Sequence, residues 1–283
     1  MIRGGSHGEG FIVKKIDCHM HVFDPAHFPY QANTHYAPAG QEIGTPAQLG
    51  QMIDAYGLRY ALLVGPNSGY GLDNSCMLDT IARGQGRYKG VAVVRNDVTL
   101  EELESLKRAG VLGVAWNVTY YGIDYYDDAE PLLKKLEALD MFVDIGAEPD
   151  QLLAMMPLLT NSGMRILIDH CGRPKVDGGL DEPGFKALLE LGATRRAFVK
   201  LSGFAKFSRE PAPHRDTWPF VGALVDAFSL ERCMWASDWP HLRAPSRVDY
   251  GVLLALVVTL FPDVSERRKI LWDTPRKLFG FAS

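Results

Sequence analysis

Three short segments of the chain concentrate side chains that can do chemistry. They are DCHMH at residues 17–21, DHCGRP at residues 169–174 and SDWPH at residues 237–241. Each segment follows an apolar or β-branched run, so each is expected where a buried strand ends. Together they supply imidazoles and carboxylates, which are the groups used for proton transfer, for stabilising an oxyanion or for binding a metal.

The two histidines of the first segment are two residues apart. In an extended strand, residues i and i+2 point to the same face, so His19 and His21 can reach one atom together. This spacing suits a pair of metal ligands or a pair of groups that hold a carbonyl oxygen. It also occurs by chance on half-exposed strands, so the pair gains weight only from the other two segments.

His170 and Asp238 follow their own apolar runs in the same way. A histidine at such a place is either catalytic or a core residue bonded to a backbone carbonyl, and convergence with His19 and His21 favours catalysis. Asp238, beside aromatic and imidazole groups, is suited to act as a general base, the alternative being a cap for the turn that follows. For His241 a structural role in that turn is at least as good an interpretation.

The three segments belong to a chain in which short strand-like runs alternate with segments of helical period. The runs predict eight strands, at residues 13–18, 60–64, 88–94, 111–116, 141–145, 165–169, 197–201 and 233–236. Helices are expected at residues 47–56, 100–109 and 184–191, because Thr45-Pro46, Thr99 and Glu182-Pro183 are typical helix starts.

Eight strand–helix units of this size predict an α/β fold with a single domain, a (β/α)8 TIM barrel over residues 11–283. The main alternative is a doubly wound open sheet. A nucleotide-binding sheet of that kind needs a glycine-rich turn after its first strand, and residues 18–21 (CHMH) stand there instead. Because a barrel carries its site at the C-terminal ends of the strands, the three segments are expected to meet.

The composition excludes several classes of protein. The 283 residues carry 30 Lys and Arg against 34 Asp and Glu, and this net charge of -4 does not suit a nucleic-acid-binding protein. The longest apolar stretch, residues 252–258, is too short to span a membrane. Residues 1–10 lack the apolar core of a signal peptide and are interpreted as a loose leader or a cloning remnant. The four cysteines form no CxxC pair, which favours a reducing cytoplasm.

In sequence and in order, the three segments resemble motifs of the amidohydrolase superfamily, in its amidohydrolase 2 branch of TIM-barrel hydrolases. The resemblance extends over nearly the whole chain and is strongest to the 2-pyrone-4,6-dicarboxylate lactonases and related sugar-acid lactonases. It implies that Asp238 activates a water molecule while His19, His21 and His170 surround the carbonyl group of a cyclic ester.

The resemblance also implies residues that hold the substrate. Tyr36 and Ser68 match substrate-holding positions, and Lys206 stands where pyrone lactonases have a carboxylate-binding arginine. Arg173 and Asn117 are further candidates for binding the substrate. After the fourth strand this chain has aromatic and amide side chains in place of the arginines of pyrone lactonases, which favours a less charged or sugar-like ligand.

A second departure concerns a metal. Metal-binding relatives carry a histidine near the end of the fifth strand, where this chain has Gly146. His19, His21 and Asp238 could still form a site for zinc or manganese, although one expected ligand is missing. We therefore predict that the protein uses no cofactor, with a divalent metal as the alternative.

These observations predict a hydrolase that opens a lactone of a carboxylic or sugar acid. Three alternatives stay open: a metal-dependent hydrolase or decarboxylase of the same superfamily, a lactone isomerase, and a protein that binds a sugar acid without turning it over. The expected partner is a small acid or lactone, with no nucleic acid and no membrane. The sequence leaves the oligomeric state open.

Overall fold

Eight parallel strands form one sheet in chain order within residues 13–283, the part of the chain that the computed structural model describes. The strands are β1 (Lys15–Met20), β2 (Leu58–Val64), β3 (Tyr88–Ala92), β4 (Val111–Asn117), β5 (Phe142–Gly146), β6 (Ile166–Ile168), β7 (Ala197–Leu201) and β8 (Cys233–Trp235). All eight strands predicted from the apolar runs are present. The interpretation of residues 1–10 lies outside the described residues.

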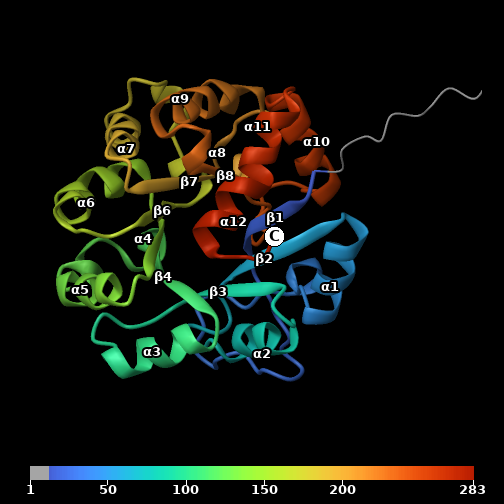
Figure 1. Cartoon of the computed structure of the whole chain (residues 1–283), viewed down its shortest axis with the longest axis vertical. Coiled ribbons are helices and arrows are strands. Elements are labelled where there is room, and N and C mark those ends of the chain that lie inside the picture. Colours follow the sequence, from blue (N-terminus) through green and yellow to red (C-terminus); the bar gives the residue numbers. More distant parts are fainter. Residues whose placement is uncertain (1–12) are drawn as a thin grey trace, which may run out of the picture.

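Helices alternate with the strands and surround them, so the molecule is a single-domain TIM barrel, as predicted (Figure 1). They are α1 (Pro46–Ala55), α2 (Ser75–Arg83), α3 (Leu100–Arg108), α4 (Val118–Tyr121), α5 (Glu130–Ala138), α6 (Pro149–Asn161), α7 (Pro183–Ala193), α8 (Phe204–Phe207), α9 (Trp218–Phe228), α10 (Tyr250–Leu260), α11 (Val264–Arg268) and α12 (Thr274–Phe279). Within residues 13–283, none of these helices is long and apolar enough to cross a membrane.

The predicted helix starts are confirmed by their caps. Thr45 and Gln48 form a reciprocal capping box at the start of α1, and Thr99 and Glu102 do the same for α3. At α7 the Glu182 side chain accepts a hydrogen bond from the backbone N–H of Phe185, the third residue of the helix. Each such cap satisfies an N–H that the helix itself leaves free, which is worth about 1 kcal/mol.

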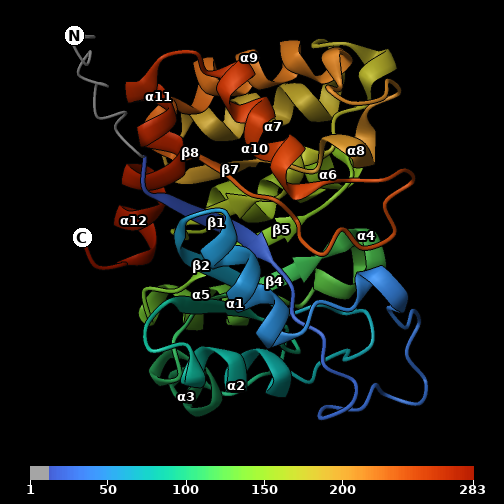
Figure 2. The same cartoon turned by 90° about the vertical axis from the view of Figure 1, so that its right-hand side faces the viewer.

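The interior of the barrel is apolar at the end away from the three chemical segments. Ile16, Leu62 and Met234 belong to one buried cluster there, together with aromatic residues from the C-terminal end of the chain. The ring of Phe281 stacks on Tyr60 with centroids 4.5 Å apart. Among residues 13–283, side chains therefore fill this end of the barrel, and the loops after β1 and β8 extend from the opposite side (Figure 2).

The first and last strands meet differently from the others. Strands β1 to β8 pair in sequence, whereas β1 and the segment after β8 are joined by an isolated bridge between Met20 and Trp239. The buried Asp17 carboxylate strengthens this junction by accepting hydrogen bonds from the backbone N–H groups of Ser237 and His19, at 3.0 and 3.2 Å. We call this junction the β1–β8 seam. It fixes the first chemical segment against the third.

Candidate active site

A pocket of about 780 Å³ opens at the C-terminal ends of the strands, and all three chemical segments line it. The lining contains His19 and His21 from β1 and its loop, Asp169 and His170 after β6, and Asp238 after β8. The pocket therefore lies where a TIM barrel carries its site. His241, for which a structural role was considered, is not among the lining residues.

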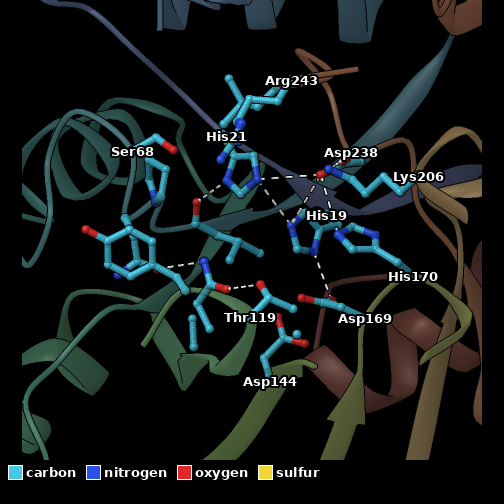
Figure 3. Close-up of a pocket in the computed structure, with 18 of the residues that line it drawn as sticks. His19, His21, Ser68, Thr119, Asp144, Asp169, His170, Lys206, Asp238 and Arg243 are labelled. Atoms are coloured by element: carbon cyan, nitrogen blue, oxygen red, sulfur yellow. Dashed lines mark hydrogen bonds and ion pairs between the residues drawn. The ribbon is translucent and has the colours of Figure 1, made fainter. Parts of the chain in front are cut away.

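Three imidazoles converge on a single carboxylate oxygen. Oδ1 of Asp238 lies 3.7 Å from Nε2 of His19, 3.6 Å from Nε2 of His21 and 3.7 Å from Nε2 of His170 (Figure 3). All four side chains are nearly inaccessible to solvent. The structure thus brings together the four residues that the sequence selected, and all four line the pocket.

Local backbone geometry aims these side chains. The pairing register of β1 with β2 shifts between Asp17 and Met20, and such an irregularity re-aims side chains next to it. His170 and Asp238 both have positive φ angles, of 52° and 63°. This left-handed conformation is uncommon for residues other than glycine and typically persists where the surrounding structure and function require it.

Lys206 is the nearest cation to the Asp238 carboxylate. Its ammonium lies 2.8 Å from Oδ2 of Asp238, whereas the three imidazole distances are to Oδ1. Burial alone would raise the pKa of Asp238, but Lys206 and His170 hold that pKa well below its usual range. Asp238 is therefore ionised at neutral pH. Lys206 was predicted to bind the substrate's acid group, and the structure places it in the pocket but already paired.

Two of the histidines are neutral at physiological pH. Burial lowers the pKa of His19 to about 4, and it lowers the pKa of His170 well below the usual histidine value. His170 is oriented through its Nδ1, which lies 3.1 Å from the Ser202 hydroxyl. A neutral imidazole has one N–H and one lone pair, so each ring can act as a donor or as a ligand at the pocket but not as both through the same atom.

A buried charged network that the sequence analysis did not identify lies beneath His19. Lys200 on β7 is completely inaccessible to solvent, and its Nζ lies 2.6 Å from Asp144, 2.8 Å from Asp169 and 3.0 Å from Nδ1 of His19. Burial alone would lower the pKa of Lys200, but Asp144 and Asp169 raise it, so the ammonium stays charged. A signal was available in the sequence, since Lys200 and Asp144 each interrupt an otherwise apolar strand.

Tyr36 and Ser68 both line the pocket, as their predicted substrate-holding role requires. The Tyr36 hydroxyl donates a hydrogen bond to Glu42. The guanidinium of Arg243 lies over the Tyr36 ring at 5.3 Å from its centroid, and Arg243 also lines the pocket. Arg243 was not predicted, and it adds a cation at the rim.

On the other side, Asn117 takes part in a chain of neutral hydrogen bonds. The Thr119 hydroxyl donates to Asn117, the Asn117 amide donates to Asn67, and the Asn67 amide donates to the Tyr121 hydroxyl, at 2.7, 3.1 and 2.9 Å. Asn67, Asn117 and Thr119 all line the pocket. This wall can therefore bind polar but uncharged parts of a ligand.

Arg173 also lines the pocket. Its guanidinium lies 3.1 Å from Glu148 through Nη1, while its buried Nε has no hydrogen-bond partner within the described residues. An unpaired buried donor of this kind costs free energy unless a ligand or water completes it. Arg173 is thus suited to bind an anion, and its role in binding the substrate stays a prediction.

The residues also fit a divalent metal by type and spacing. Ligand atoms of His19, His21 and Asp238 all lie within 4.8 Å of one another, and the same is true of His19, Asp169 and His170. Zinc accepts two histidines and one carboxylate, with bonds of about 2.0–2.2 Å, and keeps a water in the fourth position. Gly146 lies at the end of β5 and supplies no further ligand.

Comparisons with known proteins identify relatives over nearly the whole chain. A family model described as Amidohydrolase (Amidohydro_2) matches residues 16–281. The 4-sulfomuconolactone hydrolase of Rhizobium radiobacter is 34% identical over 271 residues, which cover 93% of this chain and 89% of that protein. A 2-pyrone-4,6-dicarboxylate hydrolase of Comamonas testosteroni is 28% identical over 93% of this chain and 89% of that protein.

A solved structure has the same fold over nearly the whole chain. It is a probable 2-pyrone-4,6-dicarboxylic acid hydrolase from Acinetobacter baumannii with citric acid bound, and it is 28% identical to this chain. The TM-score is 0.87, with 95% of this chain and 100% of that chain covered. The similarity therefore extends over nearly the whole barrel.

Proposed function

Because the chain belongs to the amidohydrolase family, we propose that it is a hydrolase that opens the cyclic ester of a small organic acid. The observation that carries this proposal is the position of Asp238, an ionised carboxylate with three histidine nitrogens at 3.6–3.7 Å. The relatives named as hydrolases of a sulfonated muconolactone and of a pyrone dicarboxylate support the substrate class.

In the proposed reaction, Asp238 acts as a general base. It takes a proton from a water molecule while the water oxygen bonds to the lactone carbonyl carbon. The carbonyl oxygen becomes an oxyanion, which imidazole N–H groups stabilise by hydrogen bonds. When the ring C–O bond breaks, the leaving oxygen takes the proton back from Asp238, so the product is a ring-opened hydroxy acid or its keto form.

Lys206 keeps Asp238 ionised and oriented through its contact of 2.8 Å. Arg173, Arg243 and Tyr36 supply the cationic and hydroxyl groups that hold the acid substituents of the substrate. The Acinetobacter relative was solved with citric acid bound, which supports a carboxylic acid as the class of ligand. Asn117 and Ser68 bind the uncharged polar parts of the ring.

The proposal is tested by incubating the purified protein with a panel of lactones that carry carboxylate, sulfonate or hydroxyl groups. Product NMR is expected to show a ring-opened acid for at least one of them. A product that is a different lactone would identify an isomerase, and binding without turnover across the panel would identify a binding protein. Either outcome would contradict hydrolysis.

Replacing Arg173 by glutamine is expected to weaken substrate binding more than turnover. Loss of a charge-assisted hydrogen bond costs about 1.5–3 kcal/mol, which corresponds to a KM about 10- to 100-fold higher with kcat little changed. Steady-state kinetics on the best lactone measures both constants. Arg247→Gln is the matched control, because Arg247 pairs with Asp249 on the surface and does not line the pocket. A fall in kcat alone for Arg173→Gln would show that Arg173 does not bind the ground-state acid.

We further propose that hydrolysis does not require a metal. A metal held by His19, His21 and Asp238 would supply a Lewis acid and a water of lowered pKa. Two features favour the metal-free reaction: Gly146 provides no additional ligand, and the ammonium of Lys206 already compensates the Asp238 carboxylate.

Treatment with a chelator is expected to leave kcat unchanged, and elemental analysis is expected to find far less than one metal ion per chain. The runner-up function, a metal-dependent hydrolase or decarboxylase, predicts the reverse. Stoichiometric zinc or manganese together with activity that is lost to the chelator and restored by the metal would establish it.

A further inference from the structure

The buried ammonium of Lys200 has three protons and three partners. Its Nζ lies 2.6 Å from Oδ2 of Asp144, 2.8 Å from Oδ1 of Asp169 and 3.0 Å from Nδ1 of His19. An ammonium group can only donate hydrogen bonds. If all three protons are used, Nδ1 of His19 must accept one of them, and the proton of the neutral ring must then reside on Nε2.

The contact of Nε2, the other ring nitrogen of His19, with His21 leads to the same assignment independently. Nδ1 of His21 lies 2.8 Å from the carbonyl oxygen of Val64, which can only accept, so His21 carries its proton on Nδ1. If the ring carries only this proton, Nε2 of His21 is a lone pair. Because Nε2 of His19 lies 3.2 Å from it, the hydrogen bond between the two rings requires an N–H on Nε2 of His19.

Asp169 is the one neighbour that favours the opposite tautomer. Its Oδ1 lies 3.0 Å from Nδ1 of His19 and would accept a proton carried there. That arrangement would turn an N–H toward the Lys200 ammonium and place two lone pairs face to face between His19 and His21. In the Nε2–H tautomer, only the contact between Nδ1 of His19 and Oδ1 of Asp169 has no proton between its two atoms. Lys200 donates a hydrogen bond to each of these two atoms.

We propose that Lys200 is a positioning residue that holds His19 in the Nε2–H tautomer, so that the ring presents a hydrogen-bond donor to the reacting group beside Asp238. The inference rests on the proposed function for its chemical purpose, because an oxyanion needs a donor at this position. Nε2 of His19 lies 3.7 Å from Oδ1 of Asp238, so the N–H that it donates to His21 in the free site lies beside the space where the oxyanion develops and can be donated to the oxyanion instead.

The same tautomer opposes metal binding. A metal bound through Nε2 of His19 requires a lone pair on that atom, and the ring would have to move its proton to Nδ1, next to the Lys200 ammonium. Lys200 therefore biases a donor set that could hold a metal toward metal-free chemistry.

Nitrogen-15 NMR of histidine-labelled protein tests the proposal directly, because the two ring nitrogens differ in shift according to which of them is protonated. The His19 signals are assigned by their loss in His19→Gln. In the wild-type protein near neutral pH, His19 is expected to show protonated Nε2 and unprotonated Nδ1. A wild-type spectrum with the proton on Nδ1 would overturn the proposal without any variant.

The Lys200→Met variant keeps the length of the side chain and removes its three donors. We expect the His19 proton to move to Nδ1, toward Asp169, and kcat to fall about 10- to 100-fold with KM little changed. Lys206→Met is the matched control for the spectrum, since it also removes one ammonium from the site but leaves the contacts of Nδ1 intact. Lys186→Met, which removes an ammonium paired with Asp181 on the surface, is the control for kcat. An Nε2–H signal that persists in Lys200→Met would overturn the role of Lys200.

Removal of Lys200 leaves two buried carboxylates without their cation, which can prevent folding. The double variant Lys200→Met/Asp144→Asn relieves this charge and makes the same spectroscopic prediction. If the spectra behave as expected but no lactone is hydrolysed, the proposed function fails while the tautomer assignment stands. If lactones are hydrolysed and the wild-type ring carries its proton on Nδ1, only the present inference fails.

Discussion

Asp238→Asn is expected to lower kcat on the best lactone by about 100- to 10,000-fold, the contribution typical of a positioned general base. The amide is nearly the same size as the carboxylate but cannot take a proton from water. Asparagine also tolerates the left-handed conformation that position 238 adopts, with φ of 63°, so the backbone is expected to stay in place. Single-turnover kinetics measures the chemical step.

Three other carboxylates line the same pocket, and they are not expected to replace Asp238. Asp144 and Asp169 are both held by Lys200, at 2.6 and 2.8 Å, and Glu148 is paired with Arg173 at 3.1 Å. The matched control is Asp181→Asn, since Asp181 pairs with Lys186 on the surface. Turnover within a few-fold of wild type for Asp238→Asn, with an unchanged thermal midpoint, would remove Asp238 as the base.

His19→Ala is expected to lower kcat by about 100- to 1,000-fold, the typical effect of removing one oxyanion donor. The loss should appear in kcat and kcat/KM alike, because the donor acts on charge that develops only in the transition state. Steady-state kinetics over a range of lactone concentrations separates this pattern from weakened binding.

His27→Ala serves as the control for the histidine variant. The His27 side chain is 77% exposed, it pairs with Asp24, and it does not line the pocket. Its kinetic constants should match those of the wild type. A higher KM with normal kcat in His19→Ala would instead place His19 among the groups that bind the ground-state substrate.

Much of the fold could be predicted because a parallel barrel leaves a strong local pattern. Its strands are buried on both faces and so are continuous apolar runs, as in β2, where only Arg59 is exposed. The ends of the strands were less certain. β1 continues through His19 to Met20, past the predicted end at residue 18, because Met20 pairs with Leu63. Pairing partners are not visible in a single segment.

The clustering of His19, His21, His170 and Asp238 could be predicted for a different reason. Each of them lies within three residues after a strand-like run, and barrel geometry brings such positions together. Lys200 also had a local signal, as a charged residue within an apolar strand. The partners of Lys200 lie far away in sequence, however, and their distances from it in space depend on which side chains point into the barrel. No local pattern therefore connects Lys200 with His19.

Arg243 shows the limit for loop residues. It follows β8 in a turn with φ of 52°, and its backbone N–H donates to Glu42 in the loop after β1. This contact joins positions some 200 residues apart. No periodicity predicts it, because loop conformation depends on such tertiary contacts.

The β1–β8 seam has a consequence for the nascent chain on the ribosome. Asp17 joins Ser237, and the His19 carbonyl accepts from the Asp238 N–H at 2.9 Å, so the spacing of the reacting groups is set by contacts between the first and last strands. A chain terminated before residue 233 would retain all three imidazoles but lack Asp238, and we expect it to be inactive. Two complementary fragments mixed after synthesis would regain hydrolysis only once this junction had formed.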